Sequence, residues 1–587
     1  MKKNIQNIIV ITVFLLAALS CKKEVLPPLE GSGVTEASWN AVIEADEEGE
    51  MLSLNFTASD SWTAESSDAA WCEILTPEGV KGAAALRINV KKNVSIESRT
   101  AKVAIKVNGY PLPEEMTITQ AEGLTEQGDG RYREINEWVY DKMSSTYLWN
   151  EPIPSLALDY SIGYQSFLKS ILDGVAKFDD SNHDDGAYKN EFRTEYYTQI
   201  ISSAPDTKAV GQMVHGNGFY RLRPVDLGVA IGVVVDTVIP EGPADQQGIK
   251  RGHFITEVNG VEITRDNYKS VTNKIYTDAV SVLINTVTWE GEKRDLAVIT
   301  PVGTVDLSPE YYTDPAIYKA ETVELKNGKK VGYLMYMGFH TAYNEDLMAI
   351  FDQFKSDGIE DLLLDLRYNN GGEIISSTVL ATMIAGEEYK GQTLAKLTFN
   401  KERTAAGESA TYKIGVPETI EYPDGYLPIE EALQHSIGLK RVFVIVSNYT
   451  ASASEIIING LRGLDIEVNL IGTRTSGKNV GMEGFSKRYR NYDFLLYPVS
   501  FYIENAKGFK DYPEGFEPDV YIDDSAIYPG GDFGSISDYL CNTAYGWISS
   551  GQKPSPKSKA YNSAPLDPAE PKSQRLGGSR VVYRDWL

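Results

Sequence analysis

The chain contains only three cysteines and five histidines among its 587 residues. Cys72 and Cys541 lie far apart in the sequence, so neither a disulfide framework nor a cysteine-based metal site is expected. The histidines are scattered and show no ligand spacing such as His-Glu-x-x-His. The acidic loop "KFDDSNHDDGAY" lacks the spacing of an EF-hand calcium loop and is therefore interpreted as a solvated loop. The sequence therefore predicts no metal and no cofactor.

An excess of positive charge is also absent, because 56 Lys and Arg stand against 82 Asp and Glu, a formal net charge of -26. A surface this acidic repels the phosphates of DNA and RNA. Nucleic acid is therefore not expected among the partners. Partners should be neutral or basic, or should bind in a local pocket that is insensitive to the global charge.

The apolar stretch at the N-terminus, residues 8–19, is too short to span a membrane. Lys2 and Lys3 precede it and Cys21 follows it, an order that is typical of a secretory signal. A cysteine at this place resembles the lipobox of bacterial lipoproteins. The resemblance implies a signal peptide over residues 1–21, lipidation of Cys21, and a lipid anchor in the cell envelope, on the periplasmic or the cell-surface face of a bacterial membrane. A plain cleaved signal is the alternative.

Short alternating strands follow a Pro/Gly-rich linker at residues 22–34. Segments such as "LSLNFTA" and "AKVAIKV" predict a β-sandwich over residues 35–123. The stretches "SDSWTAES" with Trp62, "AAWCEIL" with Trp71 and "MTITQAEG" resemble a BACON-type domain. That resemblance implies a glycan as a partner of the sandwich. The alternative is a spacer whose tryptophans fill the core, and the sequence favours the spacer.

Helical periodicity marks residues 128–205, and a different pattern marks residues 210–302. The stretch "EGPADQQGIKRGHFITEVNG" resembles the core of a PDZ domain. PDZ domains bind extended peptides by strand addition and hold a terminal carboxylate on loop amides. The loop implied for this role is "GNGFYRLRP", with Gly218, Phe219 and Tyr220 as candidate peptide-binding residues.

Apolar strands alternate with helices over residues 320–527, which predicts an α/β layered core around a buried sheet. The tail, residues 549–587, is rich in Pro, Ser and Lys and is predicted to be disordered. The predicted fold class is thus multidomain α+β: a β-sandwich, a small helical segment, a PDZ domain and an α/β core.

Three hydroxyls stand together in "VIVSNYTASASEIIING", namely Thr450, Ser452 and Ser454. In the structural interpretation, Ser452 and Glu455 form a capping box at a helix N-terminus. In the functional interpretation, Ser452 is a nucleophile on a strand-to-helix turn, where the helix N-terminus and the amide of Ala453 stabilise an oxyanion.

A nucleophile also needs a second amide donor and a base. Gly371 and Gly372 in "DLRYNNGG" follow a buried strand and, lacking Cβ, let the backbone approach a substrate closely. Lys478 in "GTRTSGKNVG" lies one helix and one strand after Ser452. It can act as a base only if burial lowers its pKa from ~10.4 towards 7–8. His340, near a strand end, is the alternative base. In the structural interpretation, Lys478 is a solvated surface lysine without a catalytic role.

Together, "DLRYNNGG", "NYTASASEII", "IGTRTSGKNVG" and "EGFEPDV" resemble the C-terminal processing (tail-specific) proteases, serine peptidases with a PDZ domain before the catalytic core. The resemblance implies a serine endopeptidase of the Ser-Lys type that acts on proteins or peptides with accessible C-termini. It places the nucleophile at Ser452, the general base at Lys478, and the oxyanion donors at Ala453 and the Gly371/Gly372 pair.

Three positions depart from the family pattern. Thr450 replaces a serine, and Asn479 replaces the usual glycine after the lysine. Met482 stands where many members carry a glutamine that orients the lysine amine. Two rival hypotheses therefore remain: a catalytically weak lipoprotein that binds peptide tails, and a carbohydrate-binding surface lipoprotein.

Overall fold

The chain forms two compact units, and each is described by itself. A computed structural model describes residues 34–35, 42–45, 49–93, 98–112, 115–120, 132–177, 185, 196–203, 213–290, 296–416, 429–489, 492–554, 564–565 and 582–583. Unit 1 comprises Met1–Glu137 and Leu158–Phe167, and unit 2 comprises Trp138–Ala157 and Leu168–Leu587. The predicted signal peptide, Cys21 and nearly all of the linker lie outside the described residues. None of the described helices combines the length and apolar character that a membrane crossing requires.

Unit 1 contains a β-sandwich with one core. One sheet has the order β1-β3-β7-β5 and the other the order β2-β10-β8-β4-β6, with β9 on β8. The strands are β1 (Val34–Thr35), β2 (Val42–Ala45), β3 (Glu50–Ala58), β4 (Trp62–Ser66), β5 (Cys72–Ile74), β6 (Glu78–Gly79), β7 (Gly82–Val90), β8 (Arg99–Val107), β9 (Tyr110–Pro111) and β10 (Met116–Gln120). Trp62 and Trp71 are only 4% and 5% exposed and belong to the hydrophobic core. Both tryptophans therefore fill the interior, as the spacer interpretation requires.

Two helices represent the predicted helical segment, α1 (Arg133–Thr146) and α2 (Tyr164–Ala176). On α1, the side chains of Ile135, Val139 and Met143 are fully buried, which is the stripe expected from helical periodicity. Most of the acidic loop "KFDDSNHDDGAY" lies outside the described residues. Asp185 is one of its described residues.

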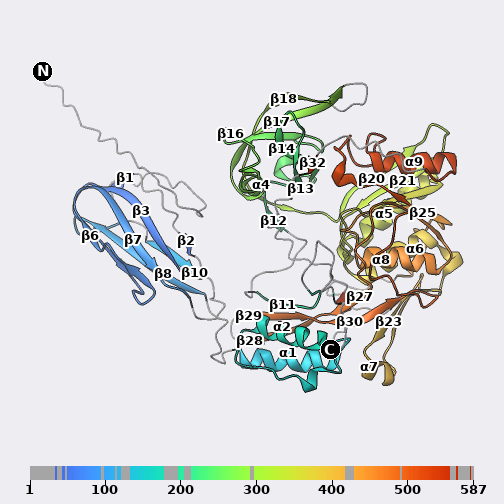
Figure 1. Ribbon diagram of the computed structural model, residues 1–587, viewed down its shortest axis with the longest axis horizontal. Coiled ribbons are helices and arrows are strands. Elements are labelled where there is room, and N and C mark those ends of the chain that lie inside the picture. The colour runs from blue at the N-terminus through green and yellow to red at the C-terminus, as the bar shows by residue number, and fades with distance from the viewer. Residues whose placement is uncertain are drawn as a thin grey trace. The chain divides into compact units, whose positions relative to one another are not determined.

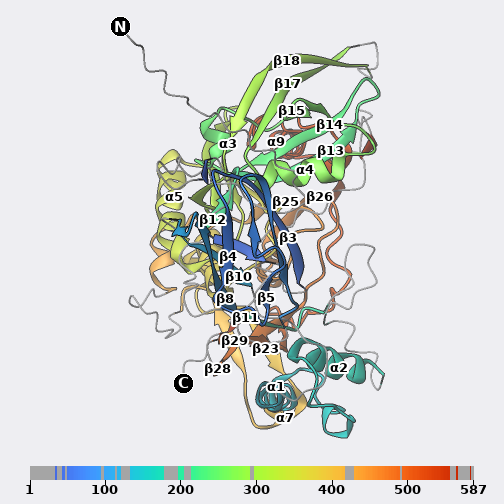
Figure 2. The same cartoon turned by 90° about the vertical axis from the view of Figure 1, so that its left-hand side faces the viewer.

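The PDZ part of unit 2 is a sheet with the order β18-β17-β15-β14-β13-β32 and with β16 on β15. The elements are β13 (Phe219–Asp226), β14 (Ile231–Val238), β15 (Phe254–Val258), β16 (Val261–Glu262), β17 (Val280–Glu290), β18 (Leu296–Leu307), β32 (Ala564–Pro565), α3 (Pro243–Gln246) and α4 (Tyr268–Thr277). Helix α4 lies beside β13 (Figure 2). Separately, β12 (Met213–Gly216) pairs with β19 (Glu310–Thr313).

The core sheet of unit 2 is buried on both faces. Its order is β20-β21-β22-β25-β26-β31, parallel except for β20. The strands are β20 (Ile317–Glu324), β21 (Lys330–Tyr336), β22 (Asp361–Asp365), β25 (Arg441–Val446), β26 (Glu467–Gly472) and β31 (Val520–Tyr521). Helices α5 (Asn344–Asp357), α6 (Ile374–Ala385) and α8 (Ala453–Gly463) cover one face, and α9 (Tyr539–Ser550) covers the other (Figure 1). A strand that is covered on both faces is apolar along its whole length, which explains the continuous apolar sequences of β22 and β25.

Two smaller sheets complete unit 2. One has the order β24-β23-β30-β27-β33 and the other the order β11-β29-β28. Their strands are β11 (Gln199–Ser203), β23 (Thr393–Phe399), β24 (Ala410–Lys413), β27 (Val480–Glu483), β28 (Phe485–Tyr489), β29 (Tyr492–Tyr497), β30 (Val499–Glu504) and β33 (Val582–Tyr583). Strand β27 begins two residues after Lys478 and fixes one end of its loop. Of the predicted disordered tail, residues 564–565 and 582–583 form strands, and most of the rest lies outside the described residues.

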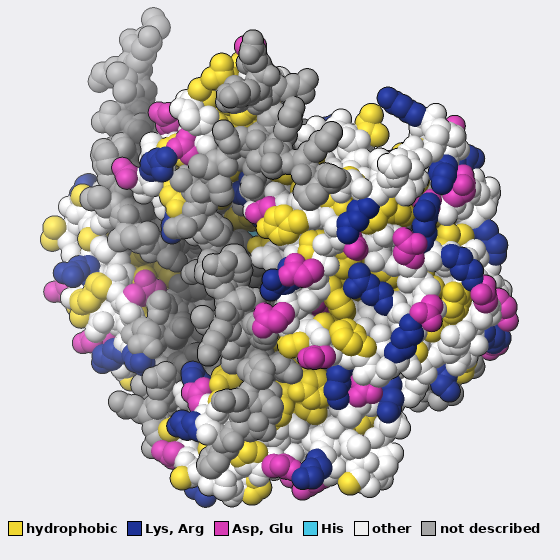
Figure 3. All heavy atoms as spheres, turned by 45° about the vertical axis from the view of Figure 1, so that its right-hand side comes forward, with side chains coloured by type: hydrophobic (Ala, Val, Ile, Leu, Met, Phe, Trp, Pro, Cys, Tyr) yellow, Lys and Arg dark blue, Asp and Glu magenta, His cyan; other side chains and the backbone are white. Residues whose placement is uncertain are grey.

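Basic and acidic side chains are interspersed on the face that Figure 3 shows. This face therefore carries no continuous basic stripe of the kind that nucleic-acid-binding proteins use.

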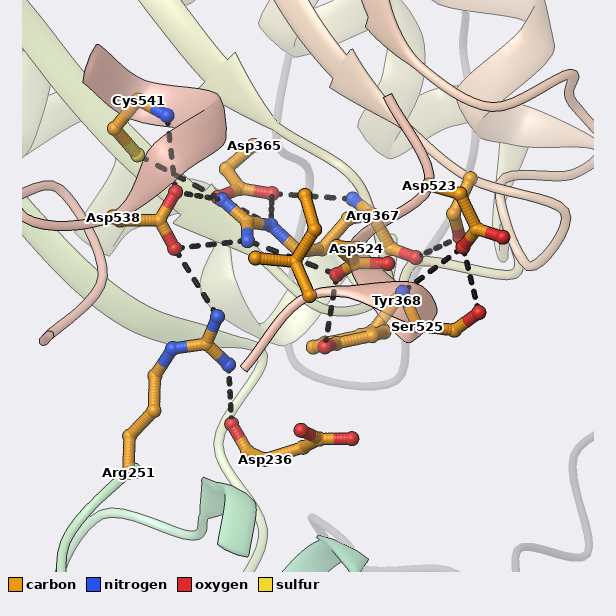
Figure 4. A network of polar contacts seen from close by, with 12 residues as sticks. Asp236, Arg251, Asp365, Arg367, Tyr368, Asp523, Asp524, Ser525, Asp538 and Cys541 are labelled. Carbon is orange, nitrogen blue, oxygen red and sulfur yellow. Dashed lines mark hydrogen bonds and ion pairs between the residues drawn. The ribbon is translucent and has the colours of Figure 1, made fainter. Parts of the chain in front are cut away.

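A buried ionic network joins the PDZ part to the α/β core. Asp538, at the N-cap of α9, accepts hydrogen bonds from Arg367 of the core (3.0 and 3.1 Å) and from Arg251 of the PDZ part (3.2 Å). Arg367 also binds Asp365, and Arg251 donates to the carbonyl oxygen of Asp236 at 2.6 Å (Figure 4). One carboxylate thus pairs with an arginine from each part.

Replacing Asp538 by asparagine should lower the free energy of unfolding by about 3 kcal/mol or more, because two buried guanidinium groups lose their shared anion. Burial opposes ionisation of Asp538, but Arg367 and Arg251 hold its pKa below the ordinary value. This stabilisation is therefore complete above the unfolded carboxyl pKa of about 4 and is lost as the pH falls through the lowered folded-state pKa.

Denaturant unfolding followed between about pH 3 and pH 8 checks this expectation. Asp465→Asn is the matched control, because the Asp465 side chain is 82% exposed and pairs with Lys507 at the surface. Equal losses in the two variants, or a loss that does not depend on pH, would contradict the role given to Asp538.

Candidate active site

The turn between β25 and α8 holds Ser452 in a strained conformation. Its φ and ψ are 60° and -117°, in a region that non-glycine residues rarely adopt, and the residue is fully buried. Such a backbone costs on the order of 1–3 kcal/mol and persists only where its surroundings enforce it. The turn therefore presents Ser452 at the N-terminus of α8, as the functional interpretation requires.

The three hydroxyls of the turn differ in their hydrogen bonds. Thr450 Oγ1 donates to the carbonyl oxygen of Leu366 at 2.8 Å, and Ser454 Oγ donates to that of Asn369 at 3.0 Å. Ser452 faces Glu455 as in a capping box, yet its buried Oγ makes no hydrogen bond to any residue that the structure describes. Of the three hydroxyls, only that of Ser452 is left available to a reactant.

Glu455 joins the serine turn to the lysine loop. Its Oε2 accepts the N–H groups of Ser452 (2.9 Å) and Lys478 (2.8 Å), and its Oε1 accepts Gly477 N–H and Thr475 Oγ1, both at 2.7 Å. Burial raises the pKa of the Glu455 carboxyl, while these hydrogen bonds act in the opposite direction. The sequence indicated only the cap, because the other donors follow twenty or more residues later.

Lys478 is a buried lysine, with 1% of its surface exposed. Its Nζ lies 4.6 Å from the centre of the Tyr197 ring. The preceding Gly477 has a φ of 85°, and a Cβ there would lie 2.0 Å from the carbonyl oxygen of Pro513, so the loop requires glycine. His340, the alternative base, is exposed after β21, and Met482 is buried in β27.

The glycine pair after β22 lies against the serine turn. A Cβ on Gly371 would stand 2.7 Å from Ser452 Cβ and 3.0 Å from Ala453 N, and a Cβ on Gly372 would stand 2.1 Å from the carbonyl oxygen of Phe339. Ala453 is the first residue of α8, so its N–H has no acceptor within the helix. The Gly371 N–H already donates to Asn369 Oδ1 at 2.8 Å, so a substrate oxygen must share or displace that acceptor.

Asn369 is a site residue that the sequence did not single out. Its side-chain Nδ2 donates to the carbonyl oxygen of Tyr336 at 2.9 Å, and its own carbonyl oxygen accepts Ser454 Oγ. The side chain thereby ties the glycine loop to β21, and the backbone carbonyl oxygen ties it to the serine turn. Its position inside "DLRYNNGG" was the only sequence signal.

The candidate peptide-binding residues of the PDZ part are only partly accessible. Gly218 packs against Pro243, and the Phe219 side chain is buried. Tyr220 Oη donates to the carbonyl oxygen of Tyr368 in the glycine loop at 3.2 Å. The next residue, Arg221, lies 5.3 Å from the ring centres of both Tyr368 and Tyr449. Their role in peptide binding stays a prediction.

Within the described part of the chain, no cluster of three or more His, Cys, Asp or Glu side chains is placed to hold a metal ion.

Four family models match successive parts of the chain. They are a putative N-terminal binding domain named BACON (residues 60–121), the Peptidase S41 N-terminal domain (134–186), a PDZ domain (234–283) and Peptidase family S41 (330–522). Their order is the order of domains expected from the sequence. The expected likeness to C-terminal processing serine proteases, with PDZ and BACON-type domains, is confirmed.

Among the relatives, a probable CtpA-like serine protease of Staphylococcus aureus (strain bovine RF122 / ET3-1) is 23% identical over 71% of this chain and 67% of its own length. A carboxyl-terminal-processing protease of Picosynechococcus sp. is 23% identical over 50% of this chain and 60% of its own length. Several other staphylococcal relatives are matched over only about half of their length.

The crystal structure of a putative S41 protease from Bacteroides fragilis covers 70% of this chain and 97% of its own, with 29% identity and a TM-score of 0.56. Its fold agrees with the multidomain arrangement of the PDZ part and the α/β core described above. Residues 330–522 therefore match peptidase family S41, a BACON domain match lies ahead of them, and the comparisons support a serine-type carboxyl-terminal-processing peptidase.

Proposed function

We propose that the protein is a lipid-anchored endopeptidase of the bacterial cell envelope that uses Ser452 as nucleophile and Lys478 as general base. The observation that carries the proposal is the unbonded, buried hydroxyl of Ser452 on a strained turn. The Glu455 carboxylate supports it, because one oxygen binds the backbone of both Ser452 and Lys478. Cys21 supplies the anchor in this proposal.

In the reaction, neutral Lys478 accepts the proton of Ser452 Oγ while the oxygen attacks the scissile carbonyl carbon. Lys478 then gives the proton to the leaving amine, and an acyl-enzyme ester forms. Water, deprotonated by the same lysine, hydrolyses the ester and releases Ser452. The N–H groups of Ala453 and of Gly371 or Gly372 bind the oxyanion, and each such donor is worth about 10²–10³ in rate.

Substrates are proteins or peptides with an accessible C-terminal segment, which the PDZ part takes as an added strand. Gly218, Phe219 and Tyr220 lie at the start of β13, where such a strand would begin. The contact of Tyr220 with the carbonyl oxygen of Tyr368 supports a connection between this edge and the glycine loop. Glycan binding by the sandwich is not supported by its two tryptophans, because both side chains are buried.

A pair of peptides that differ only at the C-terminus tests the substrate class. One ends in a free carboxylate and the other in an amide, and both are offered to residues 22–587 of the chain. The kcat/KM should be roughly tenfold or more lower for the amide, because charge-assisted hydrogen bonds to the carboxylate are lost. Ser452→Ala is the blank that measures contaminating peptidases.

Equal kcat/KM values for the two peptides would remove the C-terminal carboxylate from recognition and leave a peptidase of internal sites. Tight binding of the carboxylate peptide without turnover would instead identify the catalytically weak, tail-binding lipoprotein. Met482 in place of the family glutamine favours that alternative.

A further inference from the structure

A buried carboxylate that the proposed reaction does not use belongs to Asp185, in the segment before β11. The residue is fully buried. Its Oδ2 accepts Tyr147 Oη at 2.7 Å and its Oδ1 accepts the Thr198 N–H at 2.9 Å. Its carbonyl oxygen accepts the Tyr197 N–H at 2.6 Å. Two hydrogen bonds to the carboxylate and one to the backbone carbonyl oxygen thus hold the residue, which offsets part of the cost of burying a carboxylate.

Tyr197 connects Asp185 to the base. While its backbone N–H binds Asp185, its ring lies under Lys478 Nζ, 4.6 Å from the ring centre. Asp185 and Lys478 therefore both contact Tyr197, and the positive charge of Lys478 acts to lower the pKa of Asp185. Burial raises the pKa of Asp185 to about 7, although Tyr147, Thr198 and the charge of Lys478 oppose the rise.

The lysine loop itself supplies no polar group at the place of the family glutamine, because Met482 is apolar and buried in β27. A lysine carries two N–H groups as the amine and three as the ammonium, on a flexible four-carbon stem, so a buried lysine head group needs a neighbouring group to fix its direction. Asp185 comes from a segment almost three hundred residues earlier in the chain, which is why no local motif marks it.

We propose that Asp185 is the positioning residue of Lys478, and that it orients the amine and shares its proton in the place of the missing glutamine. This inference rests on the proposed function of Lys478 as the base. The pair holds one proton in two forms, ammonium with carboxylate or amine with carboxylic acid. Only the form with a neutral Lys478 amine and a protonated Asp185 carboxyl has a lone pair available to Ser452. The apparent pKa values of the two groups belong to the pair rather than to either residue.

The other titratable groups around the pair are tyrosines and Glu455. Tyr147 and Tyr197 contact Asp185, and Tyr196 feels its charge from the neighbouring position. Glu455 faces the backbone of Lys478. Burial, Asp173 and Asp185 raise the pKa of Tyr196 to about 12, so this phenol stays neutral at the working pH. The proposed titration near neutral pH is therefore that of the Asp185–Lys478 pair.

Asp185→Asn removes the charge and keeps the size and an acceptor oxygen. Without the anion, the buried ammonium of Lys478 loses its proton more readily, since a close opposite charge is worth about 1–3 pKa units. The acidic limb of the pH profile of kcat/KM should therefore move to lower pH by about one unit or more. The plateau should fall as well, because the amine is less well oriented.

The matched control is Asp173→Asn. Asp173 is on α2, pairs with the exposed Lys169 and accepts Tyr196 Oη at 3.1 Å, so it borders the same segment from the solvent side. Its loss should leave the limb in place. Tyr147→Phe is the second test variant: it removes the hydrogen bond that favours the charged carboxylate, so it should move the limb in the same direction by less.

An unmoved limb in both Asp185→Asn and Tyr147→Phe would overturn the inference, and an equal movement in Asp173→Asn would do so too. If Asp185→Asn does not fold, as judged by circular dichroism, Tyr147→Phe alone decides. Ser452→Ala distinguishes a failure of the proposed function from a failure of the proposed role of Asp185. A fully active Ser452→Ala removes the proposed function itself, whereas an inactive Ser452→Ala with unmoved limbs removes only the role of Asp185.

Discussion

Replacement of Ser452 by alanine should abolish peptide hydrolysis, lowering kcat on the order of 10⁶-fold, as loss of the nucleophile does in serine peptidases. The reason is that Ser452 carries the one hydroxyl of its turn that is not bonded to a carbonyl oxygen. Folding should be little affected, because Ser452 Oγ contributes no hydrogen bond among the described residues. Hydrolysis of a chromogenic tailed peptide, with denaturant unfolding in parallel, measures both effects.

Ser454→Ala is the matched control, since Ser454 is equally buried, lies two residues away and differs in donating to the carbonyl oxygen of Asn369. It should lose stability by about 1 kcal/mol or more and keep most of its turnover. An inactive Ser454→Ala beside an active Ser452→Ala would move the nucleophile to Ser454. A covalent serine-directed phosphonate, located by mass spectrometry, would show the same assignment independently.

Replacement of Lys478 by methionine should lower kcat/KM by roughly 10⁴-fold, the upper end of what a positioned base contributes. Methionine has nearly the same length and suits a site that is 1% exposed, so the loss should come from chemistry rather than from packing. The backbone N–H of residue 478 stays bonded to Glu455, so the loop should keep its path. The acyl-enzyme burst should disappear together with steady-state turnover.

Lys510→Met serves as the control for loss of a lysine, because Lys510 is partly exposed, pairs with Glu504 and has its carbonyl oxygen bonded to Asn479 Nδ2. It should retain near-complete turnover. His340→Ala addresses the rival base directly. An inactive His340→Ala with an active Lys478→Met would transfer the role of base to the histidine.

The sequence predicted those parts of the site that depend on neighbouring residues. The turn that carries Ser452, the glycines 371 and 372 and the loop of Lys478 are each encoded within about ten positions, so their local conformations follow from short motifs. The expected family, the sandwich, the PDZ domain and the α/β core are confirmed for the same reason. Which residues perform catalysis stays a prediction.

What the sequence did not predict depends on residues that meet only after folding. Glu455 looked like a simple helix cap, because its bonds to Gly477 and Lys478 cross from one loop to another. Asp185 stood in a loop that was interpreted as solvated, yet it is fully buried beside Tyr147. Periodicity and spacing describe one element at a time, and neither reports which loops a folded sheet brings together.

The ionic junction was invisible for the same reason. Arg251, Arg367 and Asp538 are separated by more than a hundred residues each, and each alone reads as a surface charge. Arg221 likewise lies against Tyr368 and Tyr449 through a contact that no motif marks. Such long-range pairs require coordinates.

The position of Asp538 near the end of the core has a consequence for the order in which the protein matures. The chain emerges from its N-terminus, so Arg251 and Arg367 are made well before the carboxylate that neutralises both of them. Until residue 538 is made, the two guanidinium groups lack the carboxylate that they share in the folded protein. The contacts that join the PDZ part to the α/β core through Asp538 therefore form only after α9 has been made, so we expect a chain truncated before α9 to lack this junction.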